Sequence, residues 1–435
     1  MQQDKILKII QEWQEEILLS AGIERYSENK IIKSLNSQPI KIITGFRRSG
    51  KSYLCKRIAN KLQQNKYPLH NILYLNFEDY KLNWANSVEK LGDIYEVFLR
   101  FSVDSQKPIL LIFDELQKIP NWESFIRTIY EKSNAPQIII TGSNSDLLSS
   151  EISSSLSGRF IEFFLLPFSF QEYLSFHNIN CDYHTRPKKL TDDFYKYLKL
   201  GGLPELYNID DPETRKSFIQ GIISKVMLDD VIKRFAIRNQ TALELILKFV
   251  LANNGRIISY AKITKHLKNL NIKIQDETVI EYIDYLKKSF TLLEVEKFDW
   301  STKKIFSGSK KYYSIDIGIS NQFRDLISNF SFNLENLVLL KLKQNPSTKK
   351  IYYGYADNKE LDFITEDYDG KLARYQISKE LNEENTTREL EAFLVSDKFI
   401  KQSPATMLVL DGITRDIEYK SSKIKQINLI EWLLS

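Results

Sequence analysis

Residues 45–52 carry the strongest chemical signal in the sequence, because their types and spacing fit a phosphate-binding loop. Gly45 is followed four residues later by the run Gly50, Lys51 and Ser52, in the pattern G-x-x-x-x-G-K-[S/T]. Glycines let backbone N–H groups approach phosphate oxygens that a side chain would obstruct. Lys51 would contact the β- and γ-phosphates, and the Ser52 hydroxyl would bind Mg²⁺. The residues expected around the phosphates are Gly45, Phe46, Arg47, Arg48, Ser49, Gly50, Lys51, Ser52 and Tyr53.

The second chemical signal is a pair of carboxylates, Asp114 and Glu115, directly after the apolar run 109–113. An apolar strand that ends in two acids is the Walker B pattern. We expect Asp114 to hold Mg²⁺, and Glu115 to orient and deprotonate the attacking water. A buried strand capped by two solvated acids would show the same residues. The position downstream of the phosphate-binding loop, with a helix–strand unit between them, favours catalysis.

Two further polar positions could act on the γ-phosphate. The apolar run 137–141 leads into Ser143 and Asn144, either of which could sit beside the γ-phosphate and the attacking water as a sensor. The same residues also favour turns, which is the structural alternative. Arg159 precedes the apolar run 160–166. It could reach the nucleotide of its own chain, reach that of a neighbouring subunit in a homo-oligomer, or form a structural ion pair.

Apart from Arg159, these residues follow the ends of strands in a regular alternation of strands and helices. Alternating strands and helices form a doubly wound parallel sheet, so residues 1–166 are expected to be an α/β nucleotide-binding core. Helices are expected from residue 51 and over 88–102 and 121–132. The runs expected to be strands are 40–44, 70–77, 109–113, 137–141 and 160–166.

The pattern changes after residue 166. Residues 167–240 are expected to form an all-helical lid beside the nucleotide. Residues 241–309 show three short helices and a β-hairpin arm over 290–298, an order typical of a winged helix. The third of these helices is acidic, with Asp276, Glu277, Glu281 and Asp284. DNA phosphates would repel such a helix, so a protein partner is at least as well supported as DNA.

Residues 310–435 are expected to form a further α/β unit. In this unit Glu335, Asp362 and the group at 376–379 could converge as an acid–acid–lysine metal site for phosphodiester cleavage. Such a site would add a second chemistry to that of the phosphate-binding loop.

The bulk composition sets limits on the class of protein. The chain has 435 residues, 43% of them hydrophobic, with a net charge of +5. That length predicts several domains, and the small positive charge permits a nucleic-acid partner without arguing for one. The two cysteines, Cys55 and Cys181, form no disulfide framework, which fits a reducing cytoplasm. No apolar stretch approaches the length needed to cross a membrane, so no membrane partner is expected.

Taken together, these segments resemble the bacterial and archaeal AAA-type ATP-binding proteins with a C-terminal domain of unknown function. The resemblance covers nearly the whole chain. It implies an AAA fold, Mg-ATP binding with hydrolysis, a winged helix, and a C-terminal domain similar to PD-(D/E)xK nucleases, but no known client. The motifs that carry it lie at 45–52, 113–122, 141–144, 156–159, 166–173, 201–205, 312–318 and 334–338.

One segment departs from this resemblance. Gln376 stands where an active nuclease has its second acid, and Ser378 stands where its lysine would be. Lys379 is one residue out of register, and a shift of one residue in a strand points a side chain to the opposite face. We therefore expect a nuclease-like fold without nuclease chemistry.

The expected function is Mg-dependent ATP hydrolysis, coupled to movement of the winged helix and the nuclease-like domain on a client. The client, DNA or a protein, would bind through residues 241–435. The alternative is a slow nucleotide-dependent switch or scaffold that recruits such a partner. A nuclease gated by ATP is less well supported, because of Gln376 and the displaced Lys379.

Overall fold

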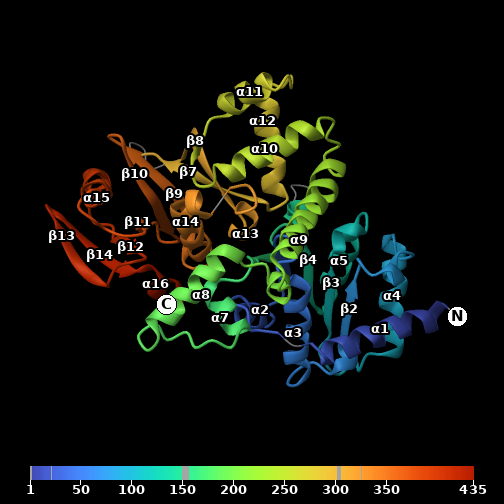
Figure 1. Ribbon diagram of the computed structural model, residues 1–435. Coiled ribbons are helices and arrows are strands. Elements are labelled where there is room, and N and C mark those ends of the chain that lie inside the picture. Colours follow the sequence, from blue (N-terminus) through green and yellow to red (C-terminus); the bar gives the residue numbers. More distant parts are fainter. Residues whose placement is uncertain (1, 21, 149–155, 301–304, 325) are drawn as a thin grey trace. The chain divides into compact units, whose positions relative to one another are not determined.

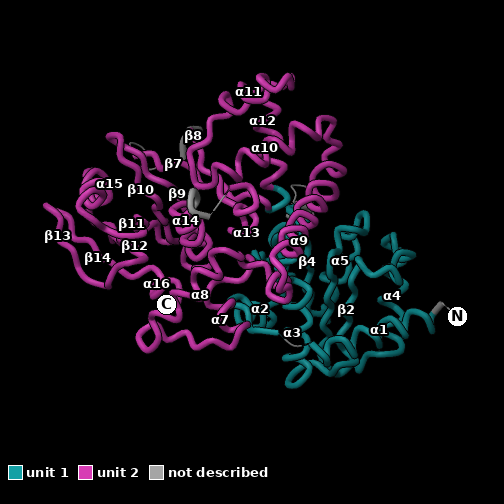
Figure 2. The backbone as a smooth tube through the Cα atoms, in the orientation of Figure 1, with its two compact units in different colours: residues 1–165, 288–290 teal, residues 166–287, 291–435 magenta. Residues whose placement is uncertain are grey.

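The computed structural model describes residues 1–435 apart from 1, 21, 149–155, 301–304 and 325 (Figure 1). The described residues form two compact units, which Figure 2 shows in different colours. Unit 1 contains residues 1–165 and 288–290, and unit 2 contains residues 166–287 and 291–435.

A five-stranded parallel sheet forms the centre of unit 1 (Figure 1). Its strand order is β2-β3-β4-β1-β5, and each neighbouring pair is parallel. Thr44 at the end of β1 pairs with Gly142 and Phe164, so the carboxyl ends of the strands share one edge. This confirms the predicted α/β fold with a parallel sheet. The strands are β1 (Ile40–Thr44), β2 (Ile72–Asn76), β3 (Leu110–Asp114), β4 (Gln137–Gly142) and β5 (Phe160–Phe164).

Helices cover both faces of this sheet. Ile42 and Ile43 of β1 belong to different hydrophobic clusters, because successive side chains of a strand point to opposite faces. The Ile42 cluster includes α4 and α5, and the Ile43 cluster includes α3. Burial on both faces explains why the strand sequences are continuously apolar. The helices are α1 (Gln2–Leu18), α2 (Glu28–Ser34), α3 (Lys51–Gln63), α4 (Val88–Phe101) and α5 (Trp122–Tyr130).

The first half of unit 2 is helical, as its sequence predicts. Ser169 and Glu172 form a capping box at the start of α7, which satisfies backbone N–H groups of the first turn. Three helices, α10 to α12, lie where short helices are predicted before the hairpin arm. The helices are α7 (Phe170–Phe176), α8 (Pro187–Leu200), α9 (Pro212–Lys225), the π-helix Val226–Lys233, α10 (Gln240–Ala252), α11 (Tyr260–Asn269) and α12 (Asp276–Lys288).

A nine-stranded sheet dominates the second half of unit 2. Its order is β13-β14-β12-β11-β10-β9-β7-β8-β6. The strands are β6 (Ile257–Ile258), β7 (Leu292–Phe298), β8 (Ile305–Ser314), β9 (Thr348–Ala356), β10 (Lys359–Asp367), β11 (Leu372–Ser378), β12 (Ala405–Val409), β13 (Arg415–Tyr419) and β14 (Ser422–Asn428). Four helices accompany them: α13 (Ile317–Ser320), α14 (Leu326–Gln344), α15 (Thr386–Ile400) and α16 (Leu429–Leu434).

The predicted hairpin arm is part of this sheet. Strands β7 and β8 are antiparallel, as expected, but β7 also pairs in parallel with β9, where Glu296 lies opposite Tyr352. The predicted domain boundary between residues 309 and 310 therefore falls inside β8. Strand pairing between distant segments thus joins regions that the sequence pattern assigns to separate domains.

A buried carboxylate connects the helical half of unit 2 to its sheet. Asp316 accepts hydrogen bonds from the backbone N–H groups of Gly202 (2.5 Å), Gly318 (2.9 Å) and Ile319 (3.3 Å). Burial raises the pKa of Asp316 to about 6, although these three hydrogen bonds act to lower it. The conspicuous pair Gly201–Gly202 thus belongs to an internal contact of unit 2.

Candidate functional site

The loop between β1 and α3 requires glycine at two positions. Gly45 has φ of 155°, and a Cβ atom there would lie 2.3 Å from the backbone oxygen of Leu165. Gly50 has φ of 96°, in the region that favours glycine. Arg48 also has a positive φ, of 65°. The loop therefore follows a path that residues with side chains rarely adopt at these positions.

Lys51 is buried and is held by the carbonyls of its own loop. Its Nζ donates to the backbone oxygens of Gly45 (3.0 Å) and Phe46 (3.2 Å). The same Nζ lies 3.7 Å from Glu115 Oε1. The structure thus places the predicted lysine beside the predicted catalytic acid at the carboxyl edge of the sheet.

Asp114 is fully buried at the end of β3. Its carboxylate accepts hydrogen bonds from the hydroxyl of Thr141 and, at 2.7 Å, from that of Tyr74. Burial and the charge of Glu115 raise the pKa of Asp114, while hydrogen bonds from Ser52, Thr141 and Tyr74 oppose that shift. The predicted pair Ser52 and Asp114 is therefore brought into direct contact.

The carboxylate of Glu115 accepts several hydrogen bonds. Its Oε2 accepts from Gln117 Nε2 (2.5 Å), from Ser143 Oγ (3.0 Å) and from the Ser143 backbone N–H (3.3 Å). Its φ of 57° is unusual for a residue with a side chain. Left-handed conformations at non-glycine residues cluster at functional sites, where the surrounding structure enforces them.

The two candidate sensor residues take different places. Ser143 contacts Glu115 directly, as described above. Asn144 is buried one residue further along, beyond the end of β4. A role of Asn144 beside the γ-phosphate stays a prediction.

Arg159 lies at the wrong edge of the sheet to act on the nucleotide of its own chain. Its backbone oxygen accepts from Ile40 N (2.7 Å) at the amino end of β1, whereas the phosphate-binding loop follows Thr44. Four residues of strand separate those ends by about 13 Å. Its guanidinium Nη2 lies 3.2 Å from Glu131 Oε1, so an ion pair is present. A role toward a neighbouring subunit stays a prediction.

The remaining loop residues contribute unequally. The side chain of Phe46 is fully buried in unit 1, so only its backbone can meet a ligand. Arg47 Nη1 lies 3.2 Å from Glu78 Oε1, at the end of the segment after β2. Tyr53 is 63% exposed on α3. Ser49 Oγ is buried and has no hydrogen-bond partner within the described residues.

Three residues that contribute to this site were not identified from the sequence. Arg25 is buried and its Nη1 donates to the backbone oxygen of Ser49 in the loop (2.8 Å), from a segment without a motif. Tyr74 looks like an ordinary core aromatic of β2, and Gln117 follows the Walker B acids without a pattern of its own. The one available signal was the position of Gln117, two residues after Glu115.

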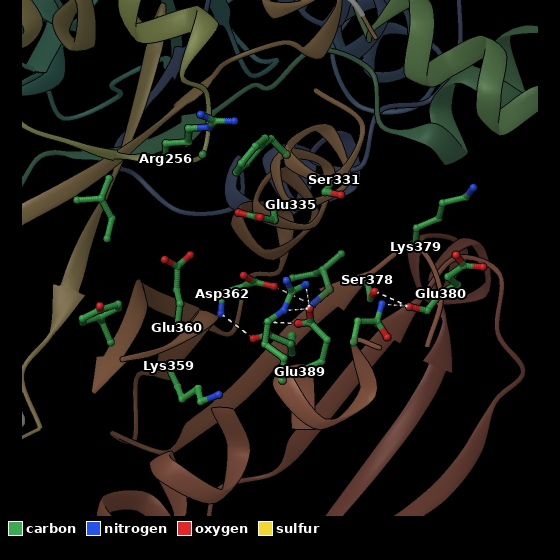
Figure 3. A pocket seen from close by; sticks show the side chains of 18 of the residues that line it. Arg256, Ser331, Glu335, Lys359, Glu360, Asp362, Ser378, Lys379, Glu380 and Glu389 are labelled. Atoms are coloured by element: carbon green, nitrogen blue, oxygen red, sulfur yellow. Dashed lines mark hydrogen bonds and ion pairs between the residues drawn. The ribbon is translucent and has the colours of Figure 1, made fainter. Parts of the chain in front are cut away.

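Unit 2 holds a separate cavity of about 820 Å³ (Figure 3). Glu335, Asp362 and Gln376 line it, so the predicted convergence of these positions is present. Lys379 borders it as well, one residue beyond the end of β11 at Ser378. Its Nζ lies 4.0 Å from Asp411 Oδ2, and Figure 3 shows its side chain directed away from Glu335 and Asp362. That Lys379 points to the opposite face stays a prediction.

Gln376 acts as a hydrogen-bonding bridge in this cavity. Its Oε1 accepts from the Asp362 backbone N–H (3.1 Å), and its Nε2 donates to Glu389 Oε2 (2.7 Å). The Ile377 N–H donates to Asp362 Oδ2 (2.8 Å). Across the residues that the structure describes, no group of three or more His, Cys, Asp or Glu side chains is arranged to hold a metal ion. Among the same residues, no helix combines the length and apolarity required to span a membrane.

Comparison with known proteins identifies two matched segments and several relatives. Residues 37–174 match the AAA domain, and residues 191–329 match a domain of unknown function, DUF8612. The uncharacterized protein MJ1544 of Methanocaldococcus jannaschii is 32% identical over 437 residues, which cover 97% of this chain and 95% of that protein. An uncharacterized protein of Haemophilus influenzae is 29% identical over 407 residues, covering 93% and 96% respectively. The Walker-type ATPase PABY2304 of Pyrococcus abyssi has 16% identity and a TM-score of 0.49, covering 70% of this chain and 96% of that one.

Proposed function

The chain belongs to the same family as MJ1544, and we propose that, with its AAA domain over residues 37–174, it binds ATP with Mg²⁺ and hydrolyses it. One observation carries the proposal: a lysine and two carboxylates meet at the carboxyl edge of the parallel sheet. Lys51 Nζ lies 3.7 Å from Glu115 Oε1, and Asp114 immediately precedes Glu115. They supply a cation for phosphates, a ligand for Mg²⁺ and a base for water, the parts that phosphoryl transfer requires.

The loop fits a polyphosphate. Gly45 and Gly50 permit the tight course of the loop, and the buried Ser49 hydroxyl has no partner within the described residues. Phosphate oxygens would accept hydrogen bonds from that hydroxyl and from the loop N–H groups. Ser52 and Asp114 would hold Mg²⁺, which when bound neutralises charge on the phosphate oxygens.

Glu115 would act as the general base. Its Oε2 accepts hydrogen bonds from Gln117 and Ser143, and its Oε1 lies 3.7 Å from Lys51 Nζ. These donors and the nearby cation would lower the basicity of the carboxylate until nucleotide binding rearranges them. Asn144 would contact the γ-phosphate, and Arg159 would act on a neighbouring subunit's nucleotide only within a homo-oligomer.

The test is steady-state ATP turnover of the wild type beside Glu115→Gln, with and without DNA. Loss of a general base lowers turnover by about 10² to 10⁴-fold. The matched control is Glu96→Gln, the same change at an exposed position of α4, which should turn over like the wild type. Wild-type turnover in Glu115→Gln, or no ATP binding by the purified protein, would contradict the proposal.

A second candidate is a slow nucleotide-dependent switch that recruits a partner. The tethered state of Glu115 favours it, because an acid held by two side-chain donors would give low basal turnover. ATP binding without turnover in either protein would support this candidate. Stimulation of turnover by DNA would instead identify DNA as the client.

We assign the client to residues 241–435. The order of α10, α11 and α12 followed by the β7–β8 hairpin supports a winged helix over 241–309, after a helical lid over 167–240. Convergence of Glu335 and Asp362 supports a nuclease-like domain over 310–435. The engagement of Gln376 by Asp362 and Glu389 argues against nuclease chemistry in it.

A further inference from the structure

A buried lysine lies among the carboxylates of the unit 2 cavity. Lys311 of β8 is 1% exposed, and its Nζ lies 2.5 Å from Glu360 Oε1 and 3.4 Å from Glu335 Oε2. The hydroxyl of Tyr313 donates to the same Glu335 oxygen at 3.1 Å. Lys311 and Tyr313 are two residues apart in the strand and so present their side chains on one face.

The acids come from two other elements. Glu360 and Asp362 belong to β10, and Glu335 belongs to α14. Figure 3 shows these three side chains turned into the same cavity. Oxygen ligands from several elements, gathered in one place, are the usual setting of a bound divalent cation.

Burial and mutual charge shift the pKa values of the lysine and of the acids in this cluster. Burial lowers the pKa of Lys311, but the charges of Glu335 and its neighbours outweigh that effect and raise it well above the ordinary value. Burial raises the pKa of Glu335 against the opposing charge of Lys311. Burial and the charge of Glu335 raise the pKa of Asp362 well above its usual range. The charge of Lys311 thus opposes the effect of burial on the pKa of Glu335 and on that of Asp362.

The lone pairs of Asp362 are also partly committed. Its Oδ2 already accepts the Ile377 N–H at 2.8 Å. Gln376, which stands where a further acid would help to hold a metal, contributes an amide that is bonded to Glu389 instead. The cluster therefore contains its own cation, the Lys311 ammonium. Few carboxylate oxygens remain free to bind a metal ion from solution.

We infer that Lys311 is the resident cation of this site: its ammonium takes the position of a divalent metal among Glu335, Glu360 and Asp362. The wild-type cavity then binds no divalent cation. Removal of the lysine charge opens a divalent-cation site for oxygen-preferring metals. This inference goes beyond the proposed ATP chemistry and does not depend on it.

The experiment uses the full chain without nucleotide and Mn²⁺ as the probe. Binding stoichiometry and the thermal midpoint are measured for the wild type, Lys311→Met, the charge-preserving Lys311→Arg, and Lys311→Met with Asp362→Asn. We expect Lys311→Met to gain one Mn²⁺ site, at least tenfold tighter than any Mn²⁺ binding by the wild type, and to be stabilised by the ion. Lys311→Arg and the Asp362→Asn double variant should lack that gain.

If Lys311→Met folds, two results would overturn the inference. One is Mn²⁺ binding by the wild type that Asp362→Asn alone removes, because the site would then be open with Lys311 in place. The other is a folded Lys311→Met without additional Mn²⁺ binding. If Lys311→Met fails to fold, the charge-balanced pair Lys311→Met with Glu335→Gln should fold and be stabilised by Mn²⁺. Failure of that pair to improve on the single variant would contradict the role of charge and reject the inference.

Discussion

Lys51 in unit 1 and Lys311 in unit 2 are both buried and both lie near glutamates, but their immediate partners differ. Lys51 donates to two neutral backbone carbonyls and stays 3.7 Å from Glu115. Lys311 lies 2.5 Å from Glu360 and 3.4 Å from Glu335. One ammonium is bonded mainly to uncharged groups, and the other is enclosed by acids.

The difference separates a site prepared for a ligand from a site already filled. Hydrogen bonds from Lys51 to carbonyls can be exchanged for phosphate oxygens, with a gain in charge pairing. Moving the Lys311 ammonium would instead leave buried carboxylates without compensation. A buried lysine beside acids therefore indicates a ligand-binding site only where its hydrogen bonds go to uncharged groups.

The sharpest way to break this comparison is to remove each charge in turn. Lys311→Met should lower the free energy of unfolding by about 3–5 kcal/mol, because it strands buried acids. Lys51→Met should lower it by about 1 kcal/mol, the usual cost of lost neutral hydrogen bonds. Urea unfolding of both variants without nucleotide measures the difference. Equal costs would show that the two lysines are held alike.

A smaller effect should follow from loosening the unit 1 site. Gln117→Ala removes one neutral donor from Glu115, worth about 0.5–1.5 kcal/mol, and should raise ATP turnover by about two- to tenfold. Steady-state kinetics provide the measurement, with the exposed Gln106→Ala as the matched control. A fall in turnover toward that of Glu115→Gln would mean that Gln117 positions the base instead of restraining it.

Asp316 sharpens the comparison further, because backbone N–H groups hold this buried carboxylate. Its folded pKa of about 6 lies above the ordinary aspartate value of 3.8, so its contribution to stability is greatest at low pH and is lost as pH rises through 6. Between pH 5 and pH 7 that loss is about 1 kcal/mol. The stability gap between the wild type and Asp316→Asn should therefore be wider at pH 5 than at pH 7 in urea unfolding. A gap independent of pH would contradict the raised pKa.

The phosphate-binding loop and the parallel sheet could be predicted because their signals are local. Gly45, Lys51 and Ser52 lie within one short run, and each strand carries its own apolar pattern. The position of Arg159 was also available in principle, since a residue before a parallel strand lies at the amino edge, away from the ligand. The position of a residue relative to its strand is therefore a better guide to its role than its closeness in sequence to a nucleotide-binding motif.

The rest depends on contacts between distant segments. Lys311 meets Glu335 and Glu360 through the arrangement of one sheet and one helix, which no local pattern encodes. Arg25 reaches Ser49 from a segment without a motif. The end of β11 at Ser378 could not be fixed to one residue either, because strand ends carry weak local signals.

The nine-stranded sheet has a practical consequence for dividing this chain into expression fragments. A truncation at residue 309 or a start at residue 310 would cut β8 and strip its pairing from β7. The fragments would then present unpaired strand edges, which recruit other chains and promote aggregation. Residues 257–428, from the first strand of the sheet to the last, must therefore be kept intact in any soluble fragment of unit 2.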